Sequence, residues 1–159
     1  MNFFISNFNW RPTLSGIALS LLLATGCAQR HNTLSEQEIA DGWELLFDGK
    51  TLDAWKDYNG DSLTMPWRAV DGCIQAHGDG SDLSGYIVTR KQYENFILDW
   101  DWKLSYGGNS GMLYHVVEDP YFKVPYVTGP EYQLIDEAGW EETNAPTKLE
   151  PWQRLGVDY

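Results

Sequence analysis

Apolar and polar residues alternate most regularly between Glu94 and Leu104. From Phe96 onward, one side of this segment is entirely apolar, and the other side is charged except at Ile97. A period of two residues predicts a β-strand that buries one face. The side chains predicted to pack in the core are Phe96, Leu98, Trp100, Trp102 and Leu104.

Shorter apolar runs elsewhere in the chain are separated by turn dipeptides, and no long helical pattern lies between them. The dipeptides are Asp48-Gly49, Asn59-Gly60, Asp71-Gly72 and Asp79-Gly80. The sequence therefore predicts an all-β protein, built as an antiparallel β-sandwich or jelly roll. Its further strands are predicted at residues 43–47, 67–76, 85–89, 109–117 and 131–136.

Single residues add local predictions. Ser35 is followed three residues later by Glu38, a capping box that predicts one or two helical turns over residues 36–40. Asp136 begins an acidic stretch and is predicted to be a turn residue. Cys73 lies in an apolar stretch and is predicted to be a small buried side chain. Gly111 is predicted to serve a close approach of other groups to the backbone.

The first 26 residues carry one charged side chain and an apolar run, Leu14–Ala24, that is too short to span a bilayer as a mature helix. The run leads into Ala24-Thr25-Gly26-Cys27, which resembles a bacterial lipobox. We therefore predict a lipoprotein signal peptide over 1–26, lipid on Cys27, and an anchor, tether and short helix over 27–41. The residue after Cys27 is alanine, which favours the outer membrane of the cell envelope. The alternative is an ordinary signal peptide with an incidental cysteine.

Composition narrows the classes of function. A length of 159 residues suits one domain, and 11 basic against 23 acidic residues give a formal charge of −12, which argues against a nucleic-acid partner. The 8 Trp and 9 Tyr favour surfaces that stack against rings. No serine-hydrolase, nucleotide-binding or cysteine-rich metal motif is visible. An acidic jelly roll can bind a divalent cation, but no ligand loop identifies such a site.

Three strings in the chain together resemble the 3-keto-disaccharide hydrolase domain family, and they are residues 42–55, 107–114 and 129–136. The resemblance assigns 42–159 to this domain and implies a concanavalin-A-like jelly roll. Members of the family continue for several more strands, so we expect the sequence to be a C-terminally truncated example. The implied substrate is a disaccharide or glycoside oxidised at C3, which an upstream sugar 3-dehydrogenase would supply.

A ketone at C3 acidifies the C2 proton, so the reaction needs a base, a group that stabilises the enolate, and an acid for the leaving oxygen. The resemblance places Glu131, Gln133, Asn109 and His115 on the concave face. Glu131 and His115 are the catalytic candidates, although the family more often has Arg where this chain has His115. Asn109 and Gln133 are expected to contact sugar hydroxyls.

Aromatic residues supply the remaining candidates, and Trp55, Trp67 and Tyr114 are predicted to contact the sugar. Each polar candidate also has a simpler interpretation, since Glu131 and Gln133 suit a solvated outer face and His115 a half-exposed strand residue. Two alternatives to an enzyme therefore stay open. They are a carbohydrate-binding lipoprotein without catalysis and an inactive fragment.

Overall fold

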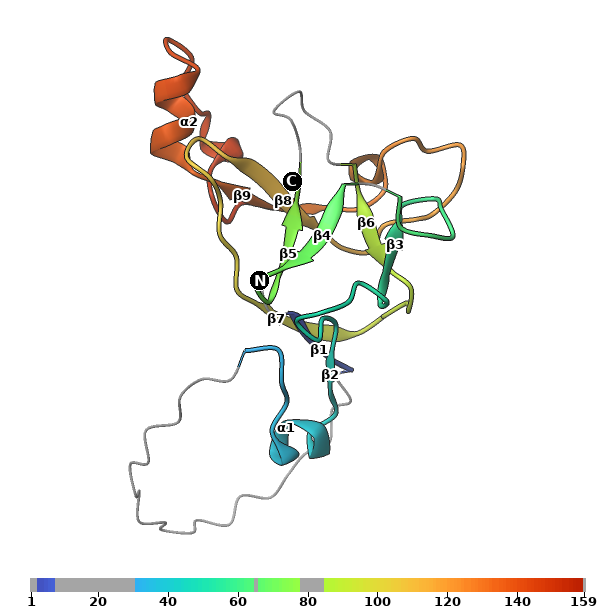
Figure 1. Cartoon of the computed structure of the whole chain (residues 1–159). Coiled ribbons are helices and arrows are strands. Elements are labelled where there is room, and N and C mark those ends of the chain that lie inside the picture. Colours follow the sequence, from blue (N-terminus) through green and yellow to red (C-terminus); the bar gives the residue numbers. More distant parts are fainter. Residues whose placement is uncertain (1–2, 8–30, 65, 78–84, 159) are drawn as a thin grey trace, which may run out of the picture.

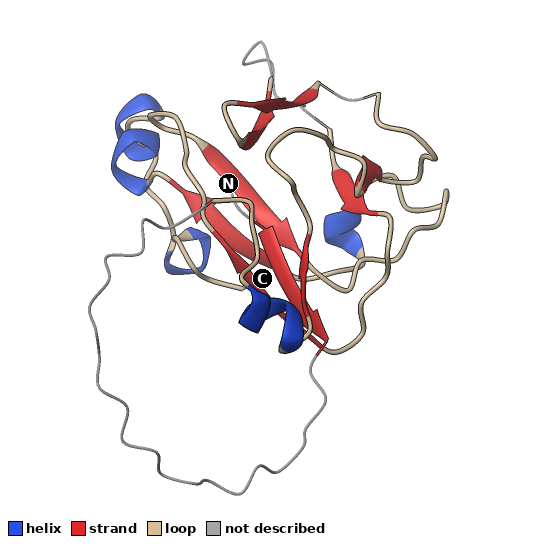
Figure 2. Cartoon of the chain, turned by 60° about the horizontal axis from the view of Figure 1, so that its bottom comes forward, coloured by secondary structure: helices blue, strands red, loops and turns tan. Residues whose placement is uncertain are grey.

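The computed structural model describes residues 3–7, 31–64, 66–77 and 85–158 (Figure 1). Short strands dominate these residues, which confirms the predicted all-β class (Figure 2). The strands are β1 (Phe3–Asn7), β2 (Trp43–Leu45), β3 (Trp55–Asp57), β4 (Trp67–Val70), β5 (Cys73–Ala76), β6 (Ile87–Thr89), β7 (Phe96–Trp100), β8 (Asn109–Leu113) and β9 (Glu131–Ile135). The helices are α1 (Glu36–Ala40) and α2 (Glu137–Thr143), with 3-10 turns at Pro125–Val127 and Pro151–Gln153.

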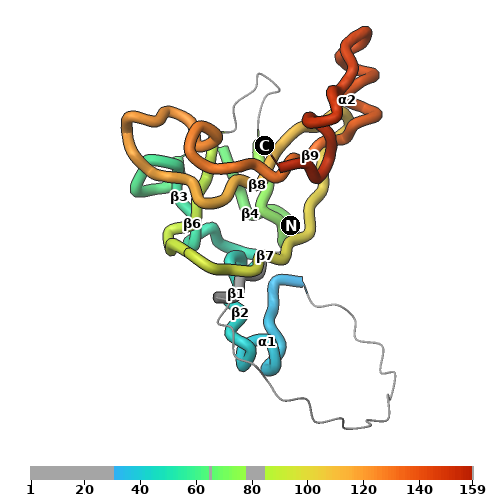
Figure 3. The backbone as a smooth tube through the Cα atoms, turned by 180° about the vertical axis from the view of Figure 1, so that it is seen from behind, coloured from blue at the N-terminus to red at the C-terminus, as the bar shows by residue number. Residues whose placement is uncertain are grey.

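All strand pairs in the described residues are antiparallel. One sheet has the order β2-β1-β7, and three further pairs are β3-β6, β4-β5 and β8-β9. The tube in Figure 3 follows the chain from β2 through the β3–β7 region to β8, β9 and α2. The pairing of β8 with β9 matters most for function, because it carries the candidate residues.

The main core is formed by four buried side chains from three parts of the chain, which are Leu46, Phe47, Trp55 and Ile74. The alternation predicted for β7 is confirmed, since Phe96, Leu98 and Trp100 pack against this core and Ile97 is 47% exposed. The strand ends at Trp100, earlier than predicted. Trp102 therefore lies beyond the strand and is 38% exposed, so its predicted place in the core is wrong.

Residues 67–76 form a hairpin rather than one strand. Asp71 and Gly72 have φ values of 50° and 73°, a left-handed pair that makes a two-residue turn between β4 and β5. Ile74 is buried at 5% exposure, and neighbouring residues of a strand point to opposite faces. Cys73 consequently faces solvent, which corrects the prediction that it is buried.

Both helices begin at a capping residue. The capping box at α1 is confirmed, because the Ser35 hydroxyl accepts from the Glu38 amide at 3.2 Å and the Glu38 carboxylate accepts from the Ser35 amide at 2.6 Å. Helix α2 was not predicted. Asp136 is its N-cap rather than a simple turn residue, and its carboxylate also accepts the Gly107 amide at 2.8 Å.

The N-terminal prediction is only partly within the described residues. Cys27 and the apolar run Leu14–Ala24 lie outside them, whereas β1 lies inside the predicted signal peptide and pairs with β2 and β7. Within the described part of the chain, none of the helices has the length and apolar character needed to cross a membrane.

Asn32 fits against Gly49 and Gly72, and its side-chain amide donates to the Gly72 carbonyl at 2.8 Å.

Candidate functional site

The β8–β9 pair brings three of the predicted site residues onto one face. Leu113 pairs with Glu131, Gly111 with Gln133 and Asn109 with Ile135, so these six positions share a face because directly paired residues point the same way. Met112 on the opposite face packs against the main core. Asn109, Glu131 and Gln133 therefore lie on one face of the β8–β9 pair.

Glu131 depends on the glycine diagonally across from it. Its carboxylate lies against the Cα of Gly111, and a β-carbon at position 111 would overlap the carboxylate. Glycine alone leaves that space open, as the predicted close approach at Gly111 requires. The sequence at 111 thus determines where the carboxylate at 131 can lie.

The Glu131 carboxylate is half-buried and makes no hydrogen bond or ion pair with the described residues. Removal from water without a compensating partner disfavours the charged form, so burial raises the pKa of Glu131 above its usual value. A raised pKa brings a carboxyl closer to the range in which it can both accept and return a proton near neutral pH.

Gln133 is only 2% exposed and is held by the last described residues. Its side-chain amide donates to the Gln153 carbonyl at 3.3 Å. Its backbone amide donates to the Val157 carbonyl, and its own carbonyl accepts from the Gly156 amide, both at 3.0 Å. These contacts indicate a structural role for Gln133, whereas Asn109 on the same face is exposed.

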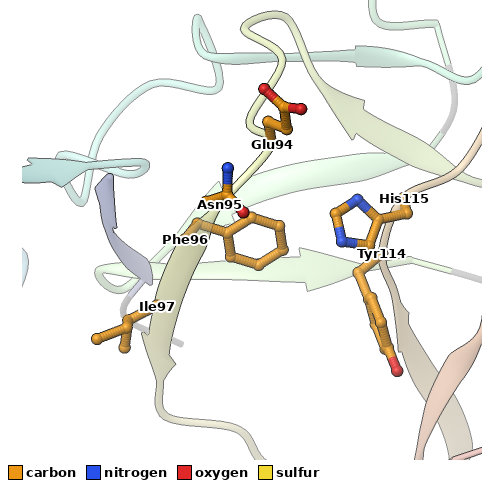
Figure 4. Close-up of a pocket in the computed structure, with 6 residues that line it drawn as sticks. All are labelled: Glu94, Asn95, Phe96, Ile97, Tyr114 and His115. Atoms are coloured by element: carbon orange, nitrogen blue, oxygen red, sulfur yellow. The ribbon is translucent and has the colours of Figure 1, made fainter. Parts of the chain in front are cut away.

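A second region, the aromatic pocket, lies between the start of β7 and the end of β8 (Figure 4). It is an open pocket of about 520 Å³, lined by Glu94, Asn95, Phe96, Ile97, Tyr114 and His115. Figure 4 shows the rings of Phe96 and His115 turned toward each other, and their centroids are 5.6 Å apart. The sequence interpretation missed the four residues of β7 and its approach, although the exception at Ile97 marked an apolar residue facing outward.

His115 ends β8 through its backbone. Its φ of 53° lies in the left-handed region, which few residues other than glycine adopt, and the predicted strand therefore stops short of Val117. The imidazole is exposed and its ring centroid is 5.7 Å from that of Tyr114. A non-glycine residue in this conformation is a reason to suspect function at the position.

The two regions lie apart along β8. Glu131 pairs with Leu113 but turns its carboxylate toward Gly111, while His115 follows Leu113 in the other direction. Positions 111 and 115 are four residues apart, and β8 ends between them at Leu113. His115 and Glu131 therefore do not form a hydrogen-bonded catalytic pair in this structure.

The predicted aromatic contacts divide between core and surface. Trp55 is 6% exposed and its indole donates to the Leu46 carbonyl at 2.8 Å, which makes it a core residue. Trp67 is half-buried and its indole donates to the Gly85 carbonyl at 3.3 Å. Tyr114 lines the aromatic pocket.

The long connection between β8 and β9 is fixed to the end of β3. Lys56 forms an ion pair with Glu118 at 2.8 Å, and the same carboxylate accepts the Asn59 amide at 3.0 Å. The Tyr58 hydroxyl donates to the Val117 carbonyl at 2.7 Å. These bonds fix the position of the residues that follow His115.

Metal ligands do not gather in the described residues, where no group of three His, Cys, Asp or Glu side chains lies close enough together to hold an ion. His77 is exposed just after β5. It belongs neither to the β8–β9 face nor to the aromatic pocket.

Comparison with known proteins places these features in a family. The sequence model of the 3-keto-alpha-glucoside-1,2-lyase-like domain matches residues 42–159. A protein of Bacteroides thetaiotaomicron named 3-keto-disaccharide hydrolase is 34% identical over 110 residues, which are 61% of this chain and 38% of that protein.

A solved structure also resembles this chain. The crystal structure of a candidate glycosyl hydrolase from Parabacteroides distasonis is 43% identical, has a TM-score of 0.66, and is matched over 80% of this chain and 59% of that one. The chain thus spans 38% and 59% of the lengths of these two relatives. Since the family model covers most of the sequence, the chain belongs to the 3-keto-alpha-glucoside-1,2-lyase-like domain family.

Proposed function

We propose that this domain, in a protein of the relatives' length, cleaves the glycosidic bond of 3-keto-disaccharides and related 3-keto-glycosides. The proposal is supported by membership of the family and by the name of the relative from Bacteroides thetaiotaomicron. It carries with it the expected jelly-roll fold, in which β8 and β9 would lie on the concave face. The observation that carries it furthest is the half-buried, unpartnered carboxylate of Glu131.

The reaction begins with proton removal. The carboxylate of Glu131 takes the proton from C2, and the C–H electron pair forms an enolate whose negative charge rests on the C3 oxygen. The electrons then form a C1–C2 double bond while the bond from C1 to the glycosidic oxygen breaks. The leaving oxygen takes up a proton, and water afterwards adds its hydroxyl to C1 and its proton to C2.

Glu131 suits this sequence because it has to change protonation state twice. It must be ionised to accept the C2 proton and protonated to return one, and a pKa raised toward the working pH favours both states being populated. Asn109, exposed on the same face, would donate its side-chain amide to a sugar hydroxyl or to the enolate oxygen.

The aromatic pocket would hold the second sugar. Phe96 and His115 present ring faces, and Glu94 and Asn95 present polar groups, a combination that suits a sugar with apolar faces and hydroxyl edges. Its position beyond the end of β8 suits a substrate that lies along this strand. His115 would then bind substrate rather than act as the base.

The test compares a 3-keto-disaccharide with its unoxidised parent, using the full-length protein and its Glu131→Gln variant. We expect cleavage of the keto sugar only, and a loss of about 100-fold or more in kcat for the variant. Glu36→Gln, on the exposed helix α1, is the matched control and should keep full activity. Equal inertness toward both sugars, or unchanged kcat in Glu131→Gln, would refute the assignment.

A non-catalytic carbohydrate-binding protein is the second candidate, favoured by exposed aromatic side chains near the long β8–β9 connection. Tyr121 is 82% exposed and Tyr126 is 56% exposed. If the protein only binds carbohydrate, sugars should quench Trp fluorescence equally well in Glu131→Gln and in the unaltered protein. Neither protein should then cleave a 3-keto sugar.

Export is part of the proposal. Lipid on Cys27 would anchor the protein in the cell envelope, with the outer membrane favoured, and a sugar 3-dehydrogenase would form the ketone upstream. Cys27→Ser should move the protein from the membrane fraction to the soluble fraction. Retention of the variant in the membrane fraction would count against lipid anchoring.

A further inference from the structure

His115 has a backbone conformation that depends on support from neighbouring residues. Its φ of 53° is left-handed, which costs free energy in a residue that carries a β-carbon. The amide of Tyr114, just before the bend, donates to the Pro130 carbonyl at 3.2 Å. The amide of Val117, just after the bend, donates to the Thr128 hydroxyl at 3.0 Å. The chain that leads into β9 therefore holds the bend at His115 from both sides.

The Thr128 hydroxyl is itself fixed in place. It donates to the Pro125 carbonyl at 3.0 Å while it accepts from the Val117 amide, so its hydrogen and one of its lone pairs are both used. The backbone amides of Thr128 and Gly129 donate to the same carbonyl, at 3.0 and 3.1 Å. A 3-10 turn with a buried proline thus presents this hydroxyl to the residues that follow His115.

Gly129 contributes by its lack of a side chain. A β-carbon at this position would overlap the Tyr114 carbonyl oxygen, and it would lie 2.7 Å from a γ-carbon of Val116 and 3.0 Å from the Val116 amide nitrogen. Carbon atoms ordinarily rest about 3.5–4.0 Å apart. The Tyr114 carbonyl and the Val116 amide belong to the two peptide groups that flank His115. Only glycine lets the two segments approach this closely.

The bend determines which way the imidazole points. If β8 continued, alternation would place His115 on the face of Gly111 and Leu113. The ring instead faces Phe96, with the two centroids 5.6 Å apart (Figure 4). Phe96 packs against the main core, as does Met112 on the opposite face of β8. The left-handed conformation therefore turns the imidazole away from the first face and into the aromatic pocket.

We propose that Thr128 and Gly129 are positioning residues for His115 and thereby determine the specificity of the aromatic pocket. Neither of them lines the pocket, and both act by holding the imidazole in it. Glu131 follows in the same stretch of chain, so one short segment fixes both the carboxylate and the pocket. The sugar assigned to the pocket rests on the proposed function, whereas the positioning of the ring does not.

The first measurement needs no substrate. In the full-length protein, ring currents of Phe96 and Tyr114 shift the NMR signals of the His115 imidazole, which are identified by their loss in His115→Asn. Thr128→Val keeps the shape of the side chain but removes the hydroxyl, so we expect these signals to move toward those of a free histidine. Thr128→Ser restores the hydroxyl and should restore the shifts. Thr147→Val, at an exposed threonine, is the matched control and should change nothing.

The second measurement is steady-state kinetics with a 3-keto-disaccharide. Thr128→Val should raise KM about 5- to 10-fold and change kcat less than about twofold, because it disturbs the pocket and not the carboxylate. Thr128→Ser should return KM to its original value. The double variant Thr128→Val/His115→Ala should be no worse than His115→Ala, since residues that act through one another are not additive. Gly129→Ala should move the imidazole signals and KM further, and the two Thr128 variants decide the matter where Gly129→Ala does not fold.

Three results would overturn the proposal. Unchanged imidazole signals in Thr128→Val would mean that the hydroxyl does not hold the ring. Equal shifts and KM in Thr128→Val and Thr128→Ser would assign the effect to packing, and additive effects of Thr128→Val and His115→Ala would mean that the two residues act independently. A protein that shows the expected NMR response but cleaves no 3-keto sugar would refute the proposed function and still support the positioning of His115.

Discussion

Two carboxylates in this domain have opposite surroundings. Asp57, at the end of β3, is 7% exposed and accepts from both the amide of Thr64, at 2.8 Å, and its hydroxyl, at 2.5 Å. Glu131, at the start of β9, is half-buried and accepts from none of the described residues. The first carboxylate lies deeper in the protein, and burial raises the pKa of the second.

The two carboxylates differ in whether hydrogen bonds compensate for their burial, and this separates a structural carboxylate from a candidate catalytic one. Hydrogen bonds to the charged form offset the cost of burial at Asp57, which therefore ties the loop after β3 to the strand. At Glu131 the cost is not offset, and a glycine keeps the space beside the carboxylate open. Unsatisfied burial of this kind is expected where a substrate supplies the missing partner.

The largest effect should come from removing that open space. Gly111→Ala places a β-carbon on the Glu131 carboxylate and forces it aside, so kcat for a 3-keto-disaccharide should fall by about 100-fold. Steady-state kinetics on the full-length protein measure the loss. Ser110→Ala, at an exposed neighbouring position, serves as the control, and an active Gly111→Ala enzyme would show that this contact does not position the carboxylate.

Asp57→Ala should act on stability instead. The variant leaves the amide and hydroxyl of Thr64 without their buried acceptor, so the free energy of unfolding should fall by about 2–4 kcal/mol. Urea denaturation followed by Trp fluorescence gives the value. Asp61→Ala, an exposed acid in the same loop, should change it by less than about 0.5 kcal/mol.

The aromatic pocket should affect binding more than chemistry. His115→Ala removes a ring that faces Phe96, so KM for the keto sugar should rise roughly 10-fold while kcat changes little. A fall in kcat as large as that of Glu131→Gln would show instead that His115 belongs to the chemical step.

Glu118→Gln tests the attachment of the long connection to β3. The variant loses the ion pair with Lys56 and weakens acceptance of the Asn59 amide, and it should lower the free energy of unfolding by about 1 kcal/mol. Lys123→Met, an exposed change in the same connection, is the comparison variant. Equal stability of the two variants would mean that the partly buried pair contributes nothing.

The smallest effect is the dependence of stability on pH. The folded state binds the Glu131 proton more tightly than the unfolded state, so its charge destabilises the fold. The contribution of Glu131 to stability should therefore be most favourable below the ordinary glutamate pKa of 4.5 and decline as pH rises through the raised value. Glu131→Gln should flatten this part of the profile, and parallel profiles for the two proteins would mean that burial of Glu131 is not the cause.

Sequence patterns predicted the features that local rules determine. The alternation around Leu98, the helix capped by Ser35, and the shared face of Glu131 and Gln133 depend on period and spacing within one element. The turn at Asp71 was visible as a dipeptide but not recognised as splitting one strand into a hairpin. Helix α2 was missed because its cap, Asp136, stood in a run of acids that suggested a loop.

Features that depend on contacts distant in sequence were not predictable. The burial of Trp55 follows from its bond to the carbonyl of Leu46, and the aromatic pocket exists only because β7 passes near His115. The turn of the Glu131 carboxylate toward Gly111, which separates it from His115, is likewise a matter of three-dimensional packing.

If the protein carries lipid on Cys27 as proposed, Asn32 limits how far the domain can move from the membrane. Its side chain is bonded to the Gly72 carbonyl and fits against Gly49, so the chain is attached to the β-rich part from Asn32 onward. The proposed lipid on Cys27 would then leave four residues between the lipidated cysteine and Asn32, a path of at most about 17 Å. The domain would then stay close to the lipid headgroups and would act on sugars that reach the membrane surface.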